Sequence, residues 1–551
     1  MKSNRKNRSD QSVMSRRSFL GTTAAGGAAL LTGGLSALFK SDALAGSNFP
    51  FVEKSILQLQ AAMAAGQVTA KDLVQGYLNR IQQLNPTLNA VIETNVNAIA
   101  IANNLDQERK GGHVRGPLHG IPLLVKDNIA TNDNMQTTAG SLALYNARVP
   151  ADAPLIQKLR AAGAIILGKA NLGEWANFRD DEAETYPLAV GWSARGGSTN
   201  NAYDLSYTSW GSSSGSGAGA AASLCAAAVG TETDGSITGP SAVENIFGLK
   251  PTLGLISGDG IVPISHQQDT AGPMGRSVTD VAILLGIMQS SQTDYTPVLH
   301  RGALNGKRIG RDTRYFDYSY YGSGIPGDEL TVAFADHALT VMASLGATIV
   351  PCDTGDVFAY NGDEFTALLY EFRAQIADYL ATLTHTNLLT LADLIAFNTA
   401  HCTQEMPYYD QDVFLFADQF VGYPNDPGYV AARTHATSTA RAGIDNAITS
   451  QNLDAIVAPH LTNSTGPAVA GYPNFSMPVG IRSSGRPAGM LMYSTAMREG
   501  QLIAMAYDLE QELNARQQPQ FLGAITPIPN GGFCTGHQPQ GKPHLPHGKI
   551  F

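Results

Sequence analysis

The chain has 551 residues, of which 43% are hydrophobic and 15% charged, so it can bury a large core. This composition excludes an intrinsically disordered protein, and the 57 glycines follow no period that would suggest a fibrous repeat. With 36 basic and 46 acidic residues, the formal net charge of −10 argues against nucleic acid or an anionic membrane as a partner.

The first 45 residues are interpreted as an export signal. Residues 2–17 are polar and basic and end in a twin-arginine-like stretch with Arg16 and Arg17. A mildly apolar, Gly/Ala-rich segment and a small-residue cleavage site at residues 43–45 follow, which disfavours the alternative of a permanent membrane anchor. Cleavage would leave 29 basic and 44 acidic residues, a net charge of −15. We expect a periplasmic or secreted protein without a stable membrane anchor.

Helix and strand patterns alternate along most of the chain. Thr69 and Asp72 can cap a helix that ends near Leu84, and Asn171 is expected to cap a helix that starts near Glu174. Other helices are predicted at residues 98–110, 153–162, 218–228, 328–345 and 501–513. Short apolar runs predict strands at residues 90–92, 121–125, 164–167, 347–350 and 455–458. The alternation predicts the α/β class with a covered sheet.

No Pro/Ser-rich linker interrupts residues 50–520, which favours one large domain, assigned here to residues 46–526. Residues 527–551 are rich in Pro, Gly and His. A surface-wrapping or disordered tail is the favoured interpretation of this stretch. The alternative is a weak metal site formed by three histidines of the tail: His537, His544 and His547.

The four cysteines form no CxxC pair, so the sequence contains no zinc or thioredoxin pattern. Cys225 lies in an apolar run and is expected to be a buried core residue. A bridge between Cys352 and Cys402 is one option that the sequence leaves open.

Two Gly/Ser segments, residues 211–217 and 230–239, carry the candidate chemistry. A flexible linker is the alternative for the first segment, but it lies deep in the chain and leads into a small-residue run. The segments lack the lysine order of a P-loop, and a G-x-S-x-G elbow fits only nominally. Glycine lets the backbone fold tightly around a serine hydroxyl. An oxyanion-binding nest could come from four consecutive backbone N–H groups: Thr233, Asp234, Gly235 and Ser236.

Ser236 needs a base, because a free hydroxyl is a weak nucleophile. Lys126 directly follows the apolar run 121–125 and could be that base if burial lowers its pKa. The alternative, a strand-end lysine that reaches into water, fits the local sequence equally well. The histidines near Pro and Gly loops have no obvious carboxylate partner in the sequence: His119, His266 and His460.

Residues 116–129 (GPLHGIPLLVKDNI) resemble the lysine segment of the amidase signature family. The two Gly/Ser segments, with 24 residues from Ser212 to Ser236, resemble the signature itself. The similarity extends over roughly residues 50–520, with the signature region at about 116–290. Within the family, four stretches are most similar to bacterial peptide amidases: residues 136–141, 174–179, 191–197 and 230–236. The resemblance implies a single large α/β/α domain with a central mixed sheet covered by helices.

The resemblance also implies an exported serine hydrolase that cleaves carboxamide C–N bonds, most of all C-terminal peptide amides, and releases ammonia. Ser236 would attack the carbonyl, Ser212 would relay the proton, and Lys126 would be the neutral base. Gly211 would join Ser212 through a cis peptide bond, and Ser213 would support the relay. No metal and no organic cofactor is implied. The substrate would be a small-molecule or peptide amide, and the enzyme a monomer or homodimer.

Other functions stay open. They are a hydrolase of fatty-acid or aryl amides or of esters from the same family, an A-type component of an amidotransferase, and a non-catalytic binding protein. The export signal argues against the amidotransferase, and the intact serines and lysine argue against the binding protein. Ser214, Gly239 and Gly173 depart from the commonest family pattern, so the reaction carries over more firmly than the substrate. Trp192 and Phe178 are candidate pocket walls.

Overall fold

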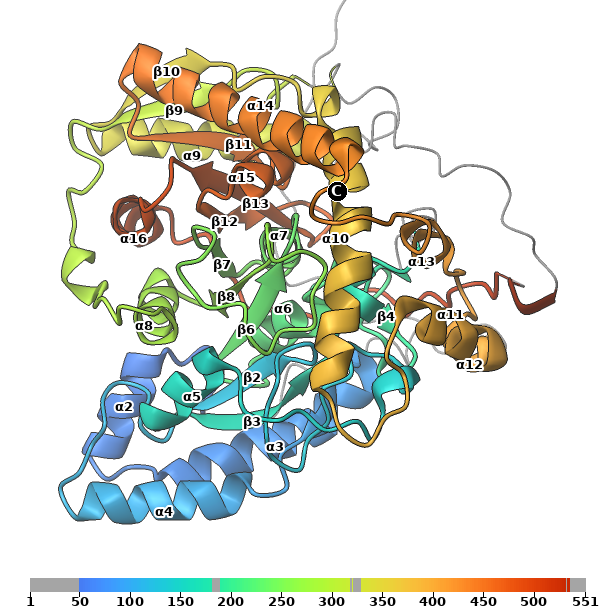
Figure 1. The fold of residues 1–551 in the computed structure, drawn as a ribbon. Coiled ribbons are helices and arrows are strands. Elements are labelled where there is room, and N and C mark those ends of the chain that lie inside the picture. The colour runs from blue at the N-terminus through green and yellow to red at the C-terminus, as the bar shows by residue number, and fades with distance from the viewer. Residues whose placement is uncertain (1–48, 181–188, 318–319, 321–328, 532, 536–551) are drawn as a thin grey trace, which may run out of the picture.

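The computed structural model describes residues 49–180, 189–317, 320, 329–531 and 533–535. Eleven strands join in one mixed sheet with helices packed against it (Figure 1). The predicted export signal and the three histidines of the tail lie outside the described residues. Among the helices of the described ranges, none combines the length and the apolar character needed to cross a membrane.

The strand order is β1-β3-β2-β6-β8-β7-β12-β13-β11-β9-β10. β2 is parallel to β3 and β6, and β9 is parallel to β10 and β11, whereas the other neighbours are antiparallel. The predicted α/β class with a central mixed sheet is therefore confirmed. The strands span Val91–Thr94, Pro122–Lys126, Ile165–Ala170, Ala227–Glu232, Phe247–Lys250, Thr270–Gly275, Arg308–Asp312, Thr348–Cys352, Ala455–Pro459, Asn474–Ile481 and Pro487–Tyr493 for β1, β2, β3, β6, β7, β8, β9, β10, β11, β12 and β13. A separate small hairpin pairs β4 (Trp192–Ser193) with β5 (Gly197–Ser198).

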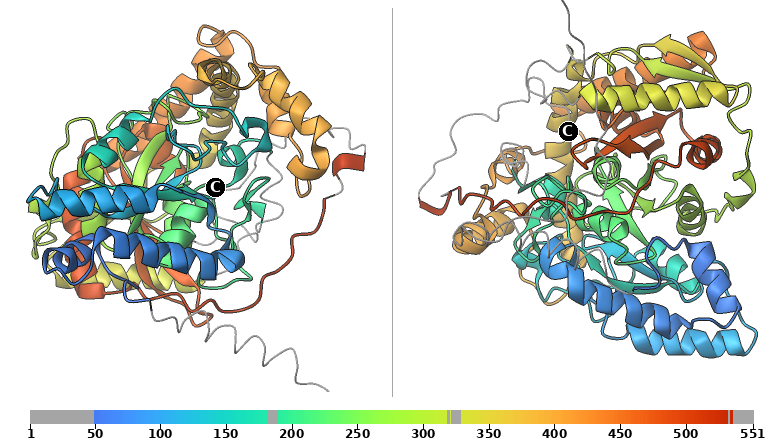
Figure 2. Two further views of the ribbon diagram at one scale, coloured as in Figure 1. Left: turned by 90° about the horizontal axis from the view of Figure 1, so that it is seen from below. Right: turned by 180° about the vertical axis from the view of Figure 1, so that it is seen from behind.

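The helices span Ile56–Ala64, Ala70–Leu88, Ala98–Lys110, Pro154–Ala161, Ser214–Ala221, Thr238–Val243, Val278–Met288 and Glu329–Ser344 for α2 to α9. They continue with Asn361–Thr382, Leu391–Ala400, Cys402–Glu405, Asp412–Ala417, Pro427–Gln451, Thr465–Ala470 and Glu499–Leu513 for α10 to α16. On one face of the sheet, α5, α8, α16 and α9 contact one another in turn. On the other face, α6 contacts α7, and α15 contacts α14. α14 lies in front of the strands in Figure 1, and α9 lies in front in the rear view of Figure 2.

Most predicted elements are present, with ends shifted by a few residues. The helix predicted to end near Leu84 is α3, which continues to Leu88 and begins with the expected capping box of Thr69 and Asp72. The helix at residues 98–110 and the buried strand at residues 455–458 are confirmed, the strand extending to Pro459. The apolar run 121–125 forms β2, which also includes Lys126.

Two local predictions are wrong. Asn171 caps no helix, because its amide donates to the carbonyls of Asn89 and Gly197 and so joins distant loops. The small-residue run 218–228 is no single helix: α6 ends at Ala221, and the chain turns and enters β6 at Ala227. Burial between neighbouring strands overrides the helical propensity of alanine in the second half of the run.

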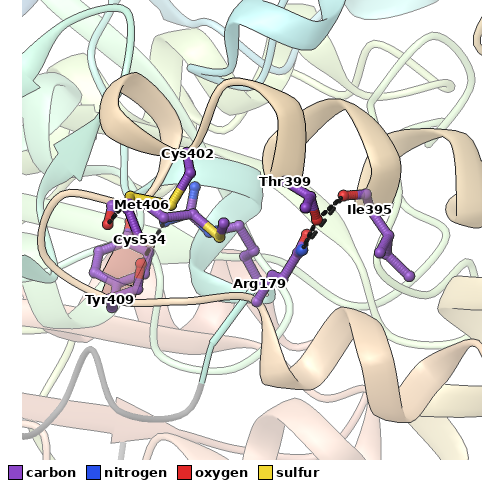
Figure 3. The surroundings of a disulfide bond; sticks show 8 residues. Arg179, Ile395, Thr399, Cys402, Met406, Tyr409 and Cys534 are labelled. Carbon is purple, nitrogen blue, oxygen red and sulfur yellow. Dashed lines mark hydrogen bonds between the residues drawn. A yellow bond between two sulfur atoms is a disulfide. The ribbon is translucent and has the colours of Figure 1, made fainter. Parts of the chain in front are cut away.

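The cysteines also differ from one option that the sequence left open. Cys402, the first residue of α12, is bonded to Cys534, 132 residues away in sequence (Figure 3). Cys352 is a buried free thiol at the end of β10, so the Cys352–Cys402 pairing is wrong. Cys225 is a buried free thiol, as expected. The disulfide fastens the chain after α16 to the helical layer of α11 to α13.

Candidate active site

Lys126 is the last residue of β2 and its side chain is fully buried. Its Nζ donates to Ser212 Oγ at 2.6 Å and to Thr231 at 2.9 Å (Oγ1) and 3.2 Å (carbonyl). Asn128 Nδ2 donates to the same Thr231 hydroxyl at 2.9 Å. The ammonium therefore does not reach into water, and the alternative of an ordinary strand-end lysine does not hold. The three partners aim Nζ at Ser212.

Ser212 and Ser213 lie directly before α6, next to the end of β6. The peptide bond between Gly211 and Ser212 is cis, as the family resemblance implied. Ser213 Oγ donates to the Thr231 carbonyl at 3.0 Å and accepts from the Thr231 N–H at 3.2 Å. The N–H of Ser213 donates to the carbonyl of Ser236 at 3.1 Å. These bonds bring the two serine segments and the end of β2 to one place.

Ser236 lies in the tight connection between β6 and α7, where Gly235 has φ +75°. Glu232 closes this connection, because its Oε2 accepts from the N–H groups of Ile237 (2.7 Å) and Thr238 (2.8 Å). Four consecutive N–H groups, those of residues 233–236, have no acceptor among the described residues. They are the same four groups that the sequence predicts as an oxyanion nest, and in this geometry they can serve a ligand.

Two side-chain contacts fix the middle of this connection. Thr233 Oγ1 donates to Asp269 Oδ1 at 2.6 Å, and Asp269 Oδ2 accepts from the N–H of Ile264 at 2.8 Å. Asp234 Oδ2 accepts from Thr465 Oγ1, at the start of α15, at 2.6 Å. The loop is thus held from both sides by elements that are remote in sequence.

Burial sets the electrostatics of the site. It lowers the pKa of Lys126 to about 7, against the opposing attraction of Asp269 and Glu232. It raises the pKa of Asp269 to about 6 and that of Asp234 to about 7. Lys126 and Ser212 are 0% exposed, whereas Ser236 is 7% exposed. A lysine that is largely neutral near pH 7 thus lies behind Ser212, and Ser236 is the most accessible of the three.

Close packing explains two of the departures from the family pattern. A Cβ on Gly239 would lie 2.2 Å from Cδ1 of Trp210, so the indole occupies the space of a larger residue. A Cβ on Gly173 would lie 2.4 Å from the carbonyl oxygen of Val190. The N–H of Gly173 donates to the carbonyl of Ser212 at 2.9 Å. Both glycines therefore support the serine segments by letting neighbours approach closely. The third departure, Ser214, donates from Oγ to Thr199 Oγ1 at 3.2 Å.

Sequence reasoning did not identify five residues that support the site: Asn128, Thr231, Asp269, Gln268 and Thr465. Four of them make contacts to residues 35 to 231 positions away in the chain, so no local spacing reveals them. Thr231 and Asp269 stand inside stretches that resemble the family, which is the one available signal.

The candidate pocket walls are part of packed aromatic clusters. Trp192 makes edge contacts with Tyr408 and Tyr409, and Phe178 packs edge-on against Phe372. Trp192 is 5% and Phe178 is 7% exposed. Their role as pocket walls remains a prediction.

Three aspartates could hold a metal ion by geometry. Asp180, Asp410 and Asp412 have carboxylate oxygens within 4.8 Å of one another. Burial and a hydrogen bond from Asp410 raise the pKa of Asp180 to about 9, which favours a carboxyl pair that shares a proton. This arrangement accounts for the cluster without a metal.

The Amidase family model matches residues 72–503 of this chain. A probable amidase of Arabidopsis thaliana is 36% identical over 499 residues, covering 86% of this chain and 93% of the relative. The crystal structure of peptide amidase from Stenotrophomonas maltophilia has a TM-score of 0.79 and 43% identity, covering 86% of this chain and 99% of that one. The A-type component of the glutamyl-tRNA(Gln) amidotransferase from Halorhodospira halophila is 36% identical over 54% of this chain and 60% of its own length. The chain is therefore an amide-hydrolysing member of the amidase signature family.

Proposed function

We propose that this enzyme hydrolyses the carboxamide C–N bond of C-terminal peptide amides and releases ammonia. The observation that carries the proposal is the buried Lys126 Nζ, 2.6 Å from Ser212 Oγ, beside the loop of Ser236. The preference for peptide amides rests on the 43% identity to a peptide amidase over 86% of the chain. The match to the amidotransferase component covers 54% of the chain, which gives less support to that alternative.

In the proposed reaction, Ser236 Oγ attacks the carbonyl carbon of the amide. Its proton passes to Ser212 Oγ, and the proton of Ser212 passes to the neutral Nζ of Lys126. The N–H groups of residues 233–236 stabilise the negative charge that develops on the carbonyl oxygen. The lysine then returns its proton through Ser212 to the leaving nitrogen, ammonia departs, and an acyl ester remains on Ser236. Water hydrolyses this ester by the same proton route and gives the free carboxylic acid.

The proposal is tested by ammonia release from a C-terminally amidated dipeptide. Wild type should release ammonia and Ser236→Ala should not, because the variant lacks the attacking oxygen. Ser216→Ala is the matched control, since Ser216 Oγ donates to the carbonyl of Val229 and touches neither Lys126 nor Ser212. If amidated peptides are inert but an aryl amide, a fatty-acid amide or an ester is cleaved, the reaction class stands and the substrate assignment falls.

We further propose that the enzyme is exported by the twin-arginine route and acts in the periplasm or outside the cell, as a monomer or homodimer. The twin-arginine-like stretch with Arg16 and Arg17 supports this, and the Cys402–Cys534 disulfide fits an oxidising compartment. Replacement of both arginines by lysine should retain the protein in the cytoplasm, as measured by fractionation. Export of the double variant would contradict the proposed route.

A further inference from the structure

A buried glutamine links the oxyanion loop to the helical layer. Gln268 lies directly before Asp269 and β8 and is 1% exposed. Its Nε2 donates to the carbonyl of Thr233 at 3.0 Å and to Glu364 Oε1, in α10, at 2.5 Å. Its Oε1 accepts from Arg433 Nη1, in α14, at 3.0 Å. Each polar atom of the side chain therefore has a partner.

The partners fix which way the amide points. A guanidinium only donates, so the oxygen of Gln268 must face Arg433. A carbonyl only accepts, so the NH2 group must face Thr233. Arg433 is itself held by two bonds to Glu371, from Nε to Oε1 at 2.9 Å and from Nη2 to Oε2 at 2.5 Å. Glu371 is fully buried. Its Oε1 also accepts from Tyr429 at 2.8 Å.

The contact to Thr233 has a consequence on the other side of the same peptide group. The Thr233 carbonyl and the Asp234 N–H belong to one planar unit and point in opposite directions when the bond is trans. The Thr233–Asp234 bond is not among the cis bonds of the chain. A hydrogen bond that fixes the carbonyl therefore fixes the direction of the N–H. The Thr233 hydroxyl, bound to Asp269, holds the same residue from its side chain.

We propose that Gln268 is a positioning residue for the oxyanion hole, which acts through the Thr233–Asp234 peptide group, and that Arg433 and Glu371 hold Gln268 in place. The inference rests on the proposed function. It assigns Gln268 no contact with substrate. Gln268 matters for the transition state because the N–H must already point at the oxyanion when charge develops there. The α10–α14 helix pair is thereby coupled to the catalytic loop.

The test compares Gln268→Met with Gln375→Met. Methionine keeps the length and burial of the side chain but cannot donate to Thr233. Gln375 is the matched control, because it is 2% exposed and bonds to the N–H of His266 and the hydroxyl of Tyr423, and not to Thr233. Gln268→Met should lower kcat about 10- to 100-fold with KM within about threefold, since one oxyanion donor is worth about 10²–10³. Gln375→Met should keep kcat within about threefold.

Three further measurements keep the inference falsifiable. A peptide aldehyde forms a tetrahedral adduct with serine, so its affinity should fall for Gln268→Met by about the same factor as kcat/KM. Arg433→Lys keeps a cation beside Glu371 but loses the fork that reaches Gln268, and it should lower kcat in wild type and change little in Gln268→Met. Equal kcat and equal aldehyde affinity for the two methionine variants would overturn the inference.

Substrate choice separates this outcome from failure of the proposed function. All variants are assayed on an amidated dipeptide and on a nitrophenyl ester, because both reactions pass through an oxyanion. If wild type cleaves only the ester, the peptide-amide proposal falls and the comparison of the two glutamines is still made on the ester. A wild type that turns over neither substrate would overturn both.

Discussion

Lys126 shows how burial, and not only residue type, makes a catalytic base. Its Nζ bonds to Ser212 and Thr231 and its side chain is fully buried. Burial disfavours the charged form and brings the pKa to about 7. Two other lysines, Lys169 and Lys250, are equally buried, and burial lowers the pKa of each to about 8. What distinguishes Lys126 is therefore its hydrogen bond to a serine.

Lys126→Met should abolish most of the activity, with kcat lower by about 10³-fold, because general-base catalysis contributes about 10²–10⁴-fold. Lys169→Met is the control: its Nζ bonds to the Ile129 carbonyl and the Thr137 hydroxyl and contacts no serine of the site. This variant should lose less than about tenfold in kcat, with thermal denaturation recorded for both. Equal losses in the two variants, at equal thermal stability, would remove Lys126 from the proposed mechanism.

The pH dependence should follow the same residue. Lys126 must be neutral to accept a proton, and below its folded pKa of about 7 it becomes charged. We therefore expect kcat/KM to fall about tenfold per pH unit below pH 7 and to level off above it. Stopped initial-rate assays between pH 5 and pH 9 would check this, with circular dichroism at each pH to confirm the fold. A flat acid limb down to pH 5 would contradict a lysine base.

At this scale the sequence predicts the residues that stand in motifs and misses those that act from a distance. Lys126, Ser212, Ser213 and Ser236 were assigned from two segments, and the structure brings these segments together. Gln268 lies 35 residues from Thr233 and is recognisable only through its hydrogen bond. Thr465 lies 231 residues from Asp234. Such partners depend on how the sheet is ordered, which no local pattern encodes.

Among the elements, the connection from Trp210 to α6 is fitted to the start of α7. The indole of Trp210 packs where a Cβ of Gly239 would be, three residues after Ser236. Trp210 also directly precedes the cis bond at Gly211. The two serine segments are thus matched by packing as well as by hydrogen bonds.

Gly239→Ala should lower kcat/KM by about 10- to 100-fold, because the added methyl would push Trp210 and shift Ser212 against Ser236. Gly258→Ala is the control, since a Cβ there meets nothing within 4 Å. It should stay within about twofold of wild type. Full activity of Gly239→Ala would show that the indole moves without disturbing the serines.

Element boundaries follow sequence where local signals are strong and depart from it where packing decides. The capping box of α3 and the predicted bounds of α4 are present because caps and apolar spacing are local. The alanine-rich run was predicted as one helix and is split between α6 and β6. A Cβ on Gly219 would lie 2.9 Å from Leu124, which shows how closely α6 approaches β2. The small residues there serve close packing.

For the whole molecule, the sequence predicts a covered α/β sheet and one continuous domain, but not the strand order. β2 and β6 are adjacent although about 100 residues separate them, and this adjacency places Lys126 beside the serines. Pairing of the cysteines was also beyond the sequence, because it depends on where the chain after α16 runs. Both are properties of the complete topology.

Reduction should lower thermal stability without abolishing activity. The Cys402–Cys534 bond lies in α12 and the C-terminal stretch, and neither cysteine contacts the proposed catalytic residues. A bond of this kind contributes about 2–4 kcal/mol in small proteins. Dithiothreitol should therefore lower Tm by a few degrees in wild type and leave the Tm of Cys534→Ser unchanged. Cys352→Ser, which alters a free thiol, should respond to the reductant like wild type.

The same bond turns a large part of the chain into a covalent ring. Residues 402 to 534 are closed into one loop that contains β11, β12, β13 and α16. The connection between α13 and α14, with Val421 57% exposed, lies inside this ring. A protease that cuts there breaks the backbone but cannot separate the two fragments. The nicked enzyme should migrate as one chain in a non-reducing gel and as two after reduction, so damage outside the cell need not mean dissociation.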